Sequence, residues 1–323
     1  MDNSQHTYFD RDSLYKSHPV ITKRYQIITP VVCQAYGMVR ERVYMRKTGT
    51  FMYATPRMGK TTCAKIIKVL LEKEFPTIFI LNFIAARRTR RAPEDEVLCS
   101  IMHASMLLTP RRIIAAELQR NLIVHIQTQL SVLNGDQFVL MVDEMQHLGD
   151  QELDCLATLH NKLDMVEISM TTIGFAQPDI LDVRGALQAS NKTYLIARFL
   201  CEPVKFTGCI SICDLKAILN DYDLVQYFPE NSGCSFTKFF LPKAFDNGFR
   251  LSEWADAIWK VLKSSAGKSS ESIPMEHLSR TIEYLLVAAS NSDSHDFKIK
   301  IEDIDAAVHA SNLSYFNGLL DVN

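Results

Sequence analysis

Ala54-Thr55-Pro56-Arg57-Met58-Gly59-Lys60-Thr61-Thr62 stands between a short apolar run at 50–54 and a helical pattern over 59–75. The segment nearly fits the P-loop pattern, in which a glycine and four variable residues precede Gly-Lys-Ser or Gly-Lys-Thr. A strand before the pattern and a helix after it are the context that this pattern requires. The sequence therefore predicts a phosphate-binding loop here, with Ala54 at the position of the first glycine.

The residue types in this loop suit a nucleotide. Backbone N–H groups and the N-terminus of the following helix surround the phosphates of a bound nucleotide. We expect the ammonium group of Lys60 to neutralise the β- and γ-phosphates and the hydroxyl of Thr61 to bind Mg²⁺. Ala54 stands where the pattern has its first glycine, a position at which a positive φ is usually used. The replacement therefore affects the expected geometry of the loop more than its chemistry. The other residues expected to line the nucleotide are Thr55, Pro56, Arg57, Met58, Gly59 and Thr62.

A second motif supports the first. The run 138–142 is uninterrupted and apolar, as expected of a central parallel strand, and Asp143 and Glu144 follow it directly. In a Walker B strand, the aspartate holds Mg²⁺ through its water shell, and the glutamate acts as the general base that activates water. We therefore predict that the chain binds ATP or GTP, with Asp143 and Glu144 in these roles.

The order of elements favours an α/β fold, because short apolar runs alternate with longer helical patterns. Further strands are predicted at 77–83, 167–173 and 203–206, and helices at 29–47, from 93, at 111–133, 151–163 and 180–198. After Gly208, helical patterns dominate, at 211–221, 236–245, 251–262, 275–289 and 301–310. We expect an N-terminal segment with a basic helix at 1–48, a nucleotide-binding α/β domain at 49–207 and a helical domain at 208–323.

Composition excludes several classes of protein. The chain has 323 residues, of which 47% are hydrophobic and 22% charged, as in ordinary globular proteins. The polar N-terminus lacks a secretory signal, and the apolar stretch 78–86 is far shorter than the roughly 20 residues of a membrane helix. No Cys-x-x-Cys pair occurs among the eight cysteines, so neither a zinc knuckle nor a disulfide framework is indicated. A cytoplasmic protein without a membrane anchor is expected.

The net charge is −2, so a surface for nucleic acid must be a local patch. Arg87, Arg88, Arg90 and Arg91 form such a patch, which we call the basic loop, directly after the predicted strand 77–83. Arginines on a loop contact phosphates without reading sequence, and no aromatic residue adjoins them for base stacking, which favours duplex DNA over single strands. A second candidate patch consists of Arg40, Arg42, Arg46 and Lys47. Because these charges are interleaved along a predicted helix, we interpret them as its solvent-exposed face.

Two segments resemble a known family. Val142-Asp-Glu-Met-Gln-His-Leu148 is similar to the "DEAQHL" Walker B motif of the AAA+ ATPases of transposition, TnsC and TniB, and of the related ExeA-like ATPases. Residues 173–179, Ile-Gly-Phe-Ala-Gln-Pro-Asp, resemble their "iGQPEL" segment with two residues inserted. The resemblance covers about residues 25–310 and is greatest to the compact TnsC proteins of CRISPR-associated transposons. It implies an AAA+ core, with a parallel sheet flanked by helices, and a C-terminal helical lid.

The resemblance also implies roles for single residues. Gln177 is the first candidate for the sensor 1 residue, and Thr172 is the alternative. Arg198, in a segment similar to the "SRF" motif of initiator-type AAA+ proteins, would be the arginine finger, with Arg184 as the alternative. Arg250 matches the "GxxR" sensor 2 pattern of AAA+ lids.

The implied activity is ATP hydrolysis with Mg²⁺. Proteins of this kind assemble as rings or helical filaments on duplex DNA and recruit a TnsA/TnsB-like transposase, together with a TniQ-like target-selection protein. The corresponding location is the bacterial cytoplasm, at the nucleoid. A helicase or initiator loader, which single-stranded DNA or a helicase would stimulate, is an alternative. An ExeA-like ATPase of secretion is another, although those proteins carry a membrane span that we do not expect here.

Overall fold

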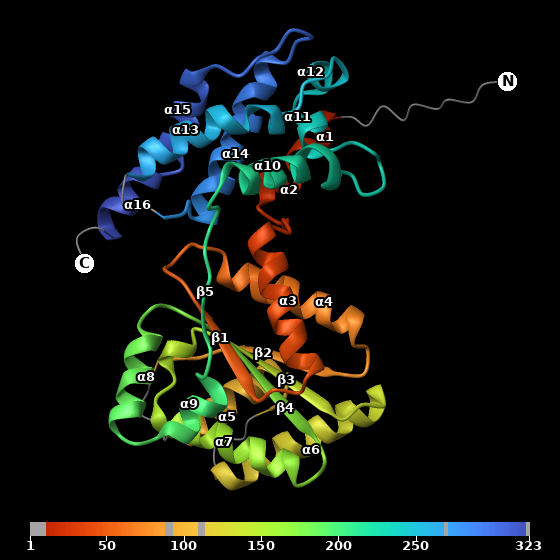
Figure 1. Ribbon diagram of the computed structural model, residues 1–323. Coiled ribbons are helices and arrows are strands. Elements are labelled where there is room, and N and C mark those ends of the chain that lie inside the picture. Colours follow the sequence, from red (N-terminus) through yellow and green to blue (C-terminus); the bar gives the residue numbers. More distant parts are fainter. Residues whose placement is uncertain (1–10, 88–92, 109–113, 268–270, 321–323) are drawn as a thin grey trace, which may run out of the picture. The chain divides into compact units, whose positions relative to one another are not determined.

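The computed structural model describes residues 11–87, 93–108, 114–267 and 271–320 (Figure 1). Contacts divide the chain into two compact units. One comprises residues 31–207, and the other combines residues 1–30 with 208–323. The predicted N-terminal segment 1–48 is thus shared between the two units, so each unit is described by itself.

The unit 31–207 is built on a five-stranded sheet in the order β2-β3-β4-β1-β5. All neighbouring strands run parallel, which confirms the predicted α/β class. All seven residues of β3 are buried, because this strand is covered on both faces and flanked by two others. The strands are β1 (Gly49–Tyr53), β2 (Phe79–Ile84), β3 (Gln137–Asp143), β4 (Ser169–Ala176) and β5 (Pro203–Lys205).

Helices cover both faces of this sheet (Figure 1). On one face, α3 (Pro30–Tyr44) and α4 (Lys60–Glu74) bury Val39 and Ile67 against alternate strand residues such as Met141. The other face carries α5 (Pro93–Ala104), α6 (Ala115–Leu133), α7 (Asp150–Asp164), α8 (Ile180–Ala189) and α9 (Thr193–Phe199). Helices α8 and α9 replace the single helix predicted at 180–198, because Asn191 between them has a φ of +58°.

The unit of residues 1–30 and 208–323 is helical in its described part. A π-helical turn, Asp221–Val225, extends α10, and a 3₁₀ turn, Leu251–Trp254, precedes α13. Three short helices were not predicted from the sequence, namely α1 (Arg11–Tyr15), α2 (Pro19–Thr22) and α16 (Leu313–Leu320). The others are α10 (Ile212–Asn220), α11 (Phe236–Phe240), α12 (Pro242–Asp246), α13 (Ala255–Ala266), α14 (Met275–Ala289) and α15 (Ile301–Ala310).

The N-terminal residues belong to the core of this helical unit. His18 is fully buried, and its Nδ1 accepts a hydrogen bond of 3.1 Å from the backbone N–H of Val20. The Tyr25 hydroxyl donates to Glu283 Oε1 at 2.8 Å. The rings of four phenylalanines surround the imidazole, namely Phe228, Phe236, Phe239 and Phe240. This aromatic cage ties the start of the chain to helices more than 200 residues away.

Within the described residues, no helix has both the length and the apolar character needed to cross a membrane. All eight cysteines are free thiols, and Cys33, Cys201 and Cys213 are exposed.

Candidate nucleotide-binding site

The predicted phosphate loop joins β1 to α4, as its sequence context requires. Positive φ values occur at Arg57 (+68°) and at Gly59 (+99°), the residue directly before α4. Ala54 has no positive φ, and its N–H donates to the carbonyl of Ala176 at 3.1 Å. Ala54 therefore continues the pairing of β1 with β4. The missing first glycine does not disturb the loop, because the chain turns later, at Arg57 and Gly59.

Lys60 lies against the backbone of this loop. Its Nζ donates to the carbonyl oxygens of Ala54 at 2.7 Å and of Thr55 at 3.1 Å, and only 7% of the residue is exposed. Burial lowers the pKa of Lys60, although the nearby carboxylates of Glu144 and Asp143 act in the opposite direction. An anion entering the loop offers this ammonium group stronger acceptors than the two carbonyls.

The two sequence motifs meet at Thr61 and Asp143. The Thr61 hydroxyl, in the first turn of α4, donates to Asp143 Oδ2 at 2.8 Å. Asp143 is the last residue of β3 and is 3% exposed, and its Oδ1 accepts from the backbone N–H of Glu144 at 3.0 Å. A hydroxyl and a carboxylate are oxygen ligands of the kind that Mg²⁺ prefers. The donor set therefore fits the predicted role of both residues.

The Glu144 carboxylate is held by two glutamines. Its Oε2 accepts from Gln177 Nε2 at 3.0 Å and from Gln146 Nε2. The side-chain oxygen of Gln146 accepts in turn from the backbone N–H of Gln177 at 2.9 Å. Burial raises the pKa of Glu144, but the two amide donors and the charge of Lys60 outweigh it, so this pKa is lower than usual. The carboxylate is thus ionised and fixed beside the loop.

The structure separates the two candidates for sensor 1. Gln177 directly follows β4, at the end of the sheet where Glu144 lies. Thr172 is fully buried inside β4, in register with Gly49, the first residue of β1. Four residues of strand, about 13 Å, separate Thr172 from the end of β4. Gln177 is therefore brought to the site and Thr172 is not.

The candidate arginine fingers hold carbonyl groups of their own chain. Arg198 Nη1 donates to the carbonyl of Ala157 at 3.1 Å, and Arg184 Nε donates to that of Leu200 at 3.1 Å. The backbone of Arg198 touches the start of β1, where a Cβ on Gly49 would lie 2.7 Å from the Arg198 carbonyl oxygen. Arg198 therefore lies at the end of β1 opposite to the phosphate loop.

Arg250 belongs to the helical unit. Its Nη1 donates to the carbonyls of Phe245 at 2.9 Å and of Phe249 at 2.6 Å. The guanidinium group also stacks over the Phe245 ring, 3.7 Å from the ring centroid. These contacts fix the side chain within its own unit, and its role at a nucleotide stays a prediction.

Of the basic loop, only Arg87 falls within the described residues, and Arg88, Arg90 and Arg91 lie outside them. Arg87 is exposed, and its Nε approaches His147 Nε2 at 3.5 Å. The other nitrogen of this imidazole, Nδ1, lies 3.0 Å from the carbonyl oxygen of Ala85. Arg87, the first residue of the basic loop, therefore contacts the residue that directly follows Gln146, a side-chain partner of Glu144.

The second basic patch, on and after α3, is engaged in ion pairs. Arg40 pairs with Glu74, and Arg42 pairs with Glu202. Arg46 contacts Asp136 at 2.7 Å, and Lys47 contacts Glu41 at 3.1 Å. Carboxylates of the same chain thus pair with all four cations. Three of the cations are exposed, as expected of a solvated helix face, whereas only 14% of the Arg42 side chain is exposed.

A hollow of about 430 Å³ adjoins Thr61 and Asp143 on the side of β2 and α5. It is also lined by Lys65 of α4, Asn82 of β2, and His103 of α5. The sequence analysis assigned no role to these residues. Asn82 interrupts an otherwise apolar strand, and that interruption was the signal for a site at this position.

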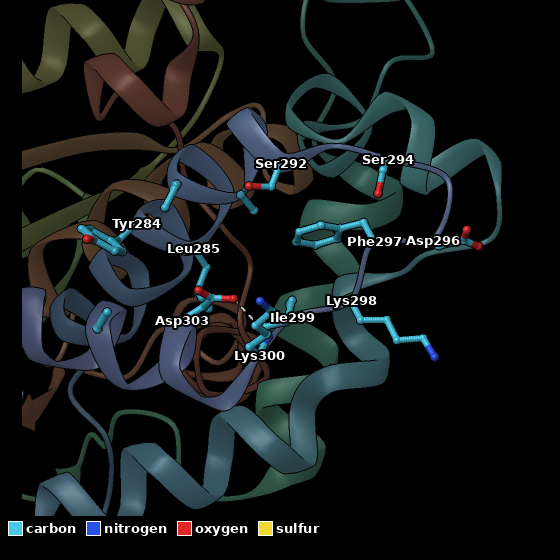
Figure 2. A pocket seen from close by; sticks show the side chains of 13 residues that line it. Tyr284, Leu285, Ser292, Ser294, Asp296, Phe297, Lys298, Ile299, Lys300 and Asp303 are labelled. Atoms are coloured by element: carbon cyan, nitrogen blue, oxygen red, sulfur yellow. Dashed lines mark hydrogen bonds between the residues drawn. The ribbon is translucent and has the colours of Figure 1, made fainter.

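A second hollow, of about 500 Å³, lies in the helical unit between α14 and the segment that leads into α15. Figure 2 shows the ring of Phe297 turned toward it beside Leu285, whereas Lys298 extends away. The backbone N–H of Lys300 donates to Asp303 at 3.1 Å and closes the start of α15. No residue with a predicted role lines this hollow.

Neither a family model nor a curated protein matches the sequence. Among solved structures, the ORC2 protein of Aeropyrum pernix in its ADP form is similar, with a TM-score of 0.57 and 14% identity over 90% of this chain and 71% of that one. Cdc6p of Pyrobaculum aerophilum has a TM-score of 0.57 and 13% identity over 87% and 67%. The ORC1 protein of A. pernix in complex with DNA has a TM-score of 0.53 and 14% identity over 89% and 67%.

These similarities confirm the predicted fold class. The chain has the AAA+ fold of the ORC and Cdc6 proteins, with a parallel sheet between helices and a C-terminal helical region.

Proposed function

We propose that this chain is an ATPase that assembles on duplex DNA and regulates DNA transposition by recruiting a transposase. The observation that carries the ATPase part is the convergence of Lys60, Thr61, Asp143, Glu144 and Gln177 at one end of the sheet. Each has the chemistry that phosphate binding, cation binding or water activation requires. The solved ORC2 structure in its ADP form supports a nucleotide on this fold.

Each side chain has one task in this proposal. Lys60 leaves the loop carbonyls to neutralise phosphate charge, and Thr61 and Asp143 would hold the cation. A Mg²⁺ ion held by these two residues would supply positive charge that offsets the charge of the phosphates. Glu144 accepts a proton from the attacking water, and the Gln177 amide orients that water or the γ-phosphate.

The basic loop supplies the contact with DNA in this proposal. It follows β2, whose last residue, Ile84, is in register with Asp143, so the loop starts at the same end of the sheet as the nucleotide site. With a net charge of −2, the chain needs a local basic patch to bind a phosphate backbone. The ORC1 protein with this fold is bound to DNA in its solved structure, which supports a nucleic-acid role.

Assembly of several copies follows from the position of Arg198. Because Arg198 lies at the end of β1 opposite to the phosphate loop, it is far from the nucleotide of its own chain. An arginine finger at this place can act only on the nucleotide of a second copy. A ring or helical filament around the duplex meets this requirement.

The link to transposition rests on residues 142–148 and 173–179, which resemble the motifs of TnsC and TniB proteins. The corresponding partners are a TnsA/TnsB-like transposase and a TniQ-like target-selection protein, in the bacterial cytoplasm at the nucleoid. A second candidate, a helicase or initiator loader, is favoured by the similarity in fold to ORC and Cdc6 proteins.

One set of measurements separates these candidates. ATP hydrolysis is measured alone, with duplex DNA and with single-stranded DNA, and the assemblies are imaged by negative-stain microscopy with an ATP analogue. The transposition proposal expects duplex-stimulated hydrolysis, ordered oligomers on duplex and ATP-dependent retention of the transposase of the same element. Stimulation by single strands or by a helicase alone would favour the loader. A chain that hydrolyses no ATP under any of these conditions contradicts both.

A further inference from the structure

We propose that the hollow of about 500 Å³ in the helical unit is a docking groove for another protein, which adds an extended peptide segment beside residues 297–299. The inference goes beyond the proposed function, because the groove belongs to the helical unit alone and its use requires neither ATP nor DNA. Three features of the described residues support it: the alternation of side chains along this segment, its unpaired backbone, and the distribution of polar groups around the hollow.

Residues 297–300 have the side-chain alternation of a β-strand. Phe297 is half-buried and Ile299 is buried, whereas Lys298 and Lys300 are exposed. Figure 2 shows the Phe297 ring turned toward the docking groove and Lys298 extending away from it. Successive side chains of an extended chain point to opposite sides in this way. The segment therefore presents an apolar side and a basic side, although it lies outside the five strands of the sheet.

The backbone of this segment is unpaired at its centre. Neither the N–H nor the carbonyl group of Lys298 makes a hydrogen bond to any described residue, and the same is true of Ile299. An extended backbone with unpaired groups is a template on which a second chain adds as a β-strand. In an antiparallel pair, one residue exchanges its N–H and its carbonyl with a single residue opposite. Lys298 and Ile299 therefore provide backbone groups that an incoming peptide can pair with.

Contacts on both sides of these residues hold the segment in place. Asp293 accepts hydrogen bonds of 3.0 Å from two backbone N–H groups at the start of α12. The Phe297 ring packs edge-on against the Phe249 ring, with 5.5 Å between the ring centroids. At the other end, the N–H of Lys300 donates to Asp303 at 3.1 Å. The segment is thus preorganised, so little conformational entropy is lost there when a partner binds.

The lining of the hollow suits an apolar side chain better than a small polar ligand. The buried Leu285 lines it together with Ala288 and Ala306, whose small side chains leave room for a bulky group. A site for a small molecule normally has a few buried polar groups that converge on the ligand. Here the charged residues of the lining are all exposed, namely Asp296, Lys298, Lys300 and Asp303. A peptide can place an apolar side chain in the hollow while its backbone pairs with the segment.

The basic side of the segment indicates the charge of the peptide. Lys298 and Lys300 are two residues apart, and neither makes an ion pair with another described residue. Side chains that lie opposite each other on paired strands interact, and opposite charges stabilise the pair. Asp296, two residues before Lys298, favours a basic residue at the corresponding end of the peptide. The partner is therefore an extended segment with apolar residues at alternate positions and acidic residues between them.

The test finds such a peptide without knowledge of the partner. A phage-displayed library of random peptides is selected on the full chain without nucleotide or DNA, and the affinity of enriched peptides is measured by fluorescence polarisation. Ala288→Trp and Ala306→Trp fill the docking groove from α14 and from α15, respectively. Ala310→Trp, at an exposed alanine of α15 outside the lining, is the matched control. Thermal unfolding shows whether each variant is folded.

We expect the enriched peptides to share apolar residues two positions apart with Asp or Glu between them. Each tryptophan in the groove should weaken binding by at least about 10-fold, because burial of one large apolar side chain is worth that factor or more. Lys298→Glu should weaken it by about 3- to 10-fold through the cross-strand charges, and Ala310→Trp should leave it unchanged. Methylation of single peptide nitrogens should weaken binding by about 3- to 10-fold, and only at every second position, because N–H groups of a strand point alternately to its two edges.

Several outcomes would overturn the inference. The selection enriches no peptide, or the enriched peptides bind Ala288→Trp and Ala306→Trp as tightly as the unaltered chain. Equal effects of methylation at neighbouring positions would also contradict it, because the peptide is then not added as a strand. If one tryptophan variant does not fold, the other decides, and the methylated peptides decide if both fail. Because ATP and DNA are absent from the test, its failure leaves the proposed function unaffected.

Discussion

The hydroxyl of Thr61 donates a hydrogen bond of 2.8 Å to the carboxylate of Asp143, 82 residues later in the chain. Asp143 ends β3, and Thr61 lies at the start of α4, which follows β1. These two strands are not neighbours, because β4 lies between them. The end of β4 therefore lies between the phosphate loop and the end of β3. Gln177, which directly follows β4, occupies this position. Ligands of open parallel sheets bind at these carboxyl ends of strands. Strand order thus explains why three separate segments form one site.

The first prediction concerns nucleotide binding. Lys60→Ala should weaken ATP binding by at least about 100-fold, because charge-assisted hydrogen bonds to the phosphates are lost. Glu144→Gln should keep the affinity and lose hydrolysis, since only the base is removed. Isothermal titration with an ATP analogue and a phosphate-release assay measure the two effects. Lys68→Ala, on the outer side of α4, is the control. Equal affinities in the unaltered chain and in Lys60→Ala would contradict the P-loop assignment.

A second prediction distinguishes Gln177 from Thr172. Gln177→Ala should lower kcat by about 100-fold, in the range found when a group that orients the reaction is removed. Thr172→Val should leave kcat unchanged, because the Thr172 hydroxyl is buried within the sheet and bonds to no other described residue. Its free energy of unfolding should change by less than about 1 kcal/mol or rise, since an unsatisfied polar group disappears. A larger loss of kcat in Thr172→Val would reverse the assignment.

Much of the fold could be predicted because the signals are local. The run at 138–142 and the helical spacing over 59–75 are patterns of adjacent residues, and both elements are present as β3 and α4. The division of the predicted helix 180–198 was not predicted, because a single asparagine in a sequence is weak evidence for a positive φ at that position. The three short helices have too few turns for a periodic pattern.

The parts of the site that sequence analysis missed depend on contacts between distant segments. The side chains of Gln146 and His147 were quoted within a motif, but their partners in other segments directly follow β4 and β2. The pairing of Arg46 with Asp136 likewise joins residues 90 positions apart. His18 gives no signal in a polar N-terminus, and only the fold places it among four aromatic rings. Motifs therefore identify the reacting groups, whereas tertiary contacts determine what restrains them.

The third prediction concerns assembly and uses two inactive variants. Arg198→Ala subunits mixed with Glu144→Gln subunits should recover part of the hydrolysis, because some interfaces then combine an intact Glu144 with an intact Arg198 from the neighbour. Phosphate release is followed across mixing ratios, and co-assembly is checked by light scattering. Arg184→Ala serves as the comparison variant. A lack of recovery at every ratio, with both variants assembled, would exclude Arg198 as the finger.

The fourth prediction is a loss of stability in acid that originates at His18. Burial lowers the pKa of His18 from 6.5 to about 4, so the unfolded chain binds a proton in this interval that the folded chain does not. The stabilisation is complete above pH 6.5 and is lost as the pH falls toward 4, by up to about 3 kcal/mol. Urea unfolding at several pH values should show this slope. His18→Asn, which keeps an N-cap acceptor but cannot titrate, should show a shallower slope. The same slope in both chains would assign the effect to other histidines.

The last prediction concerns the basic loop, and its motive is the contrast between a net charge of −2 and four arginines within five residues. If these arginines contact the duplex, the logarithm of the binding constant should fall with the logarithm of the salt concentration, with a slope of about −0.9 for each phosphate neutralised.

Replacement of Arg87, Arg88, Arg90 and Arg91 by alanine should flatten that slope and reduce stimulation of ATP hydrolysis by duplex DNA. Binding of an ATP analogue should persist, because the described contacts of the phosphate loop and of Asp143 include none of these residues. Duplex affinity at four or more salt concentrations, for two unrelated sequences, is the deciding measurement, with exposed Arg120→Ala of α6 as the control. An unchanged slope would mean that another part of the chain binds the duplex. The cations of α3 are poor substitutes, since Arg40 and Arg42 already pair with carboxylates.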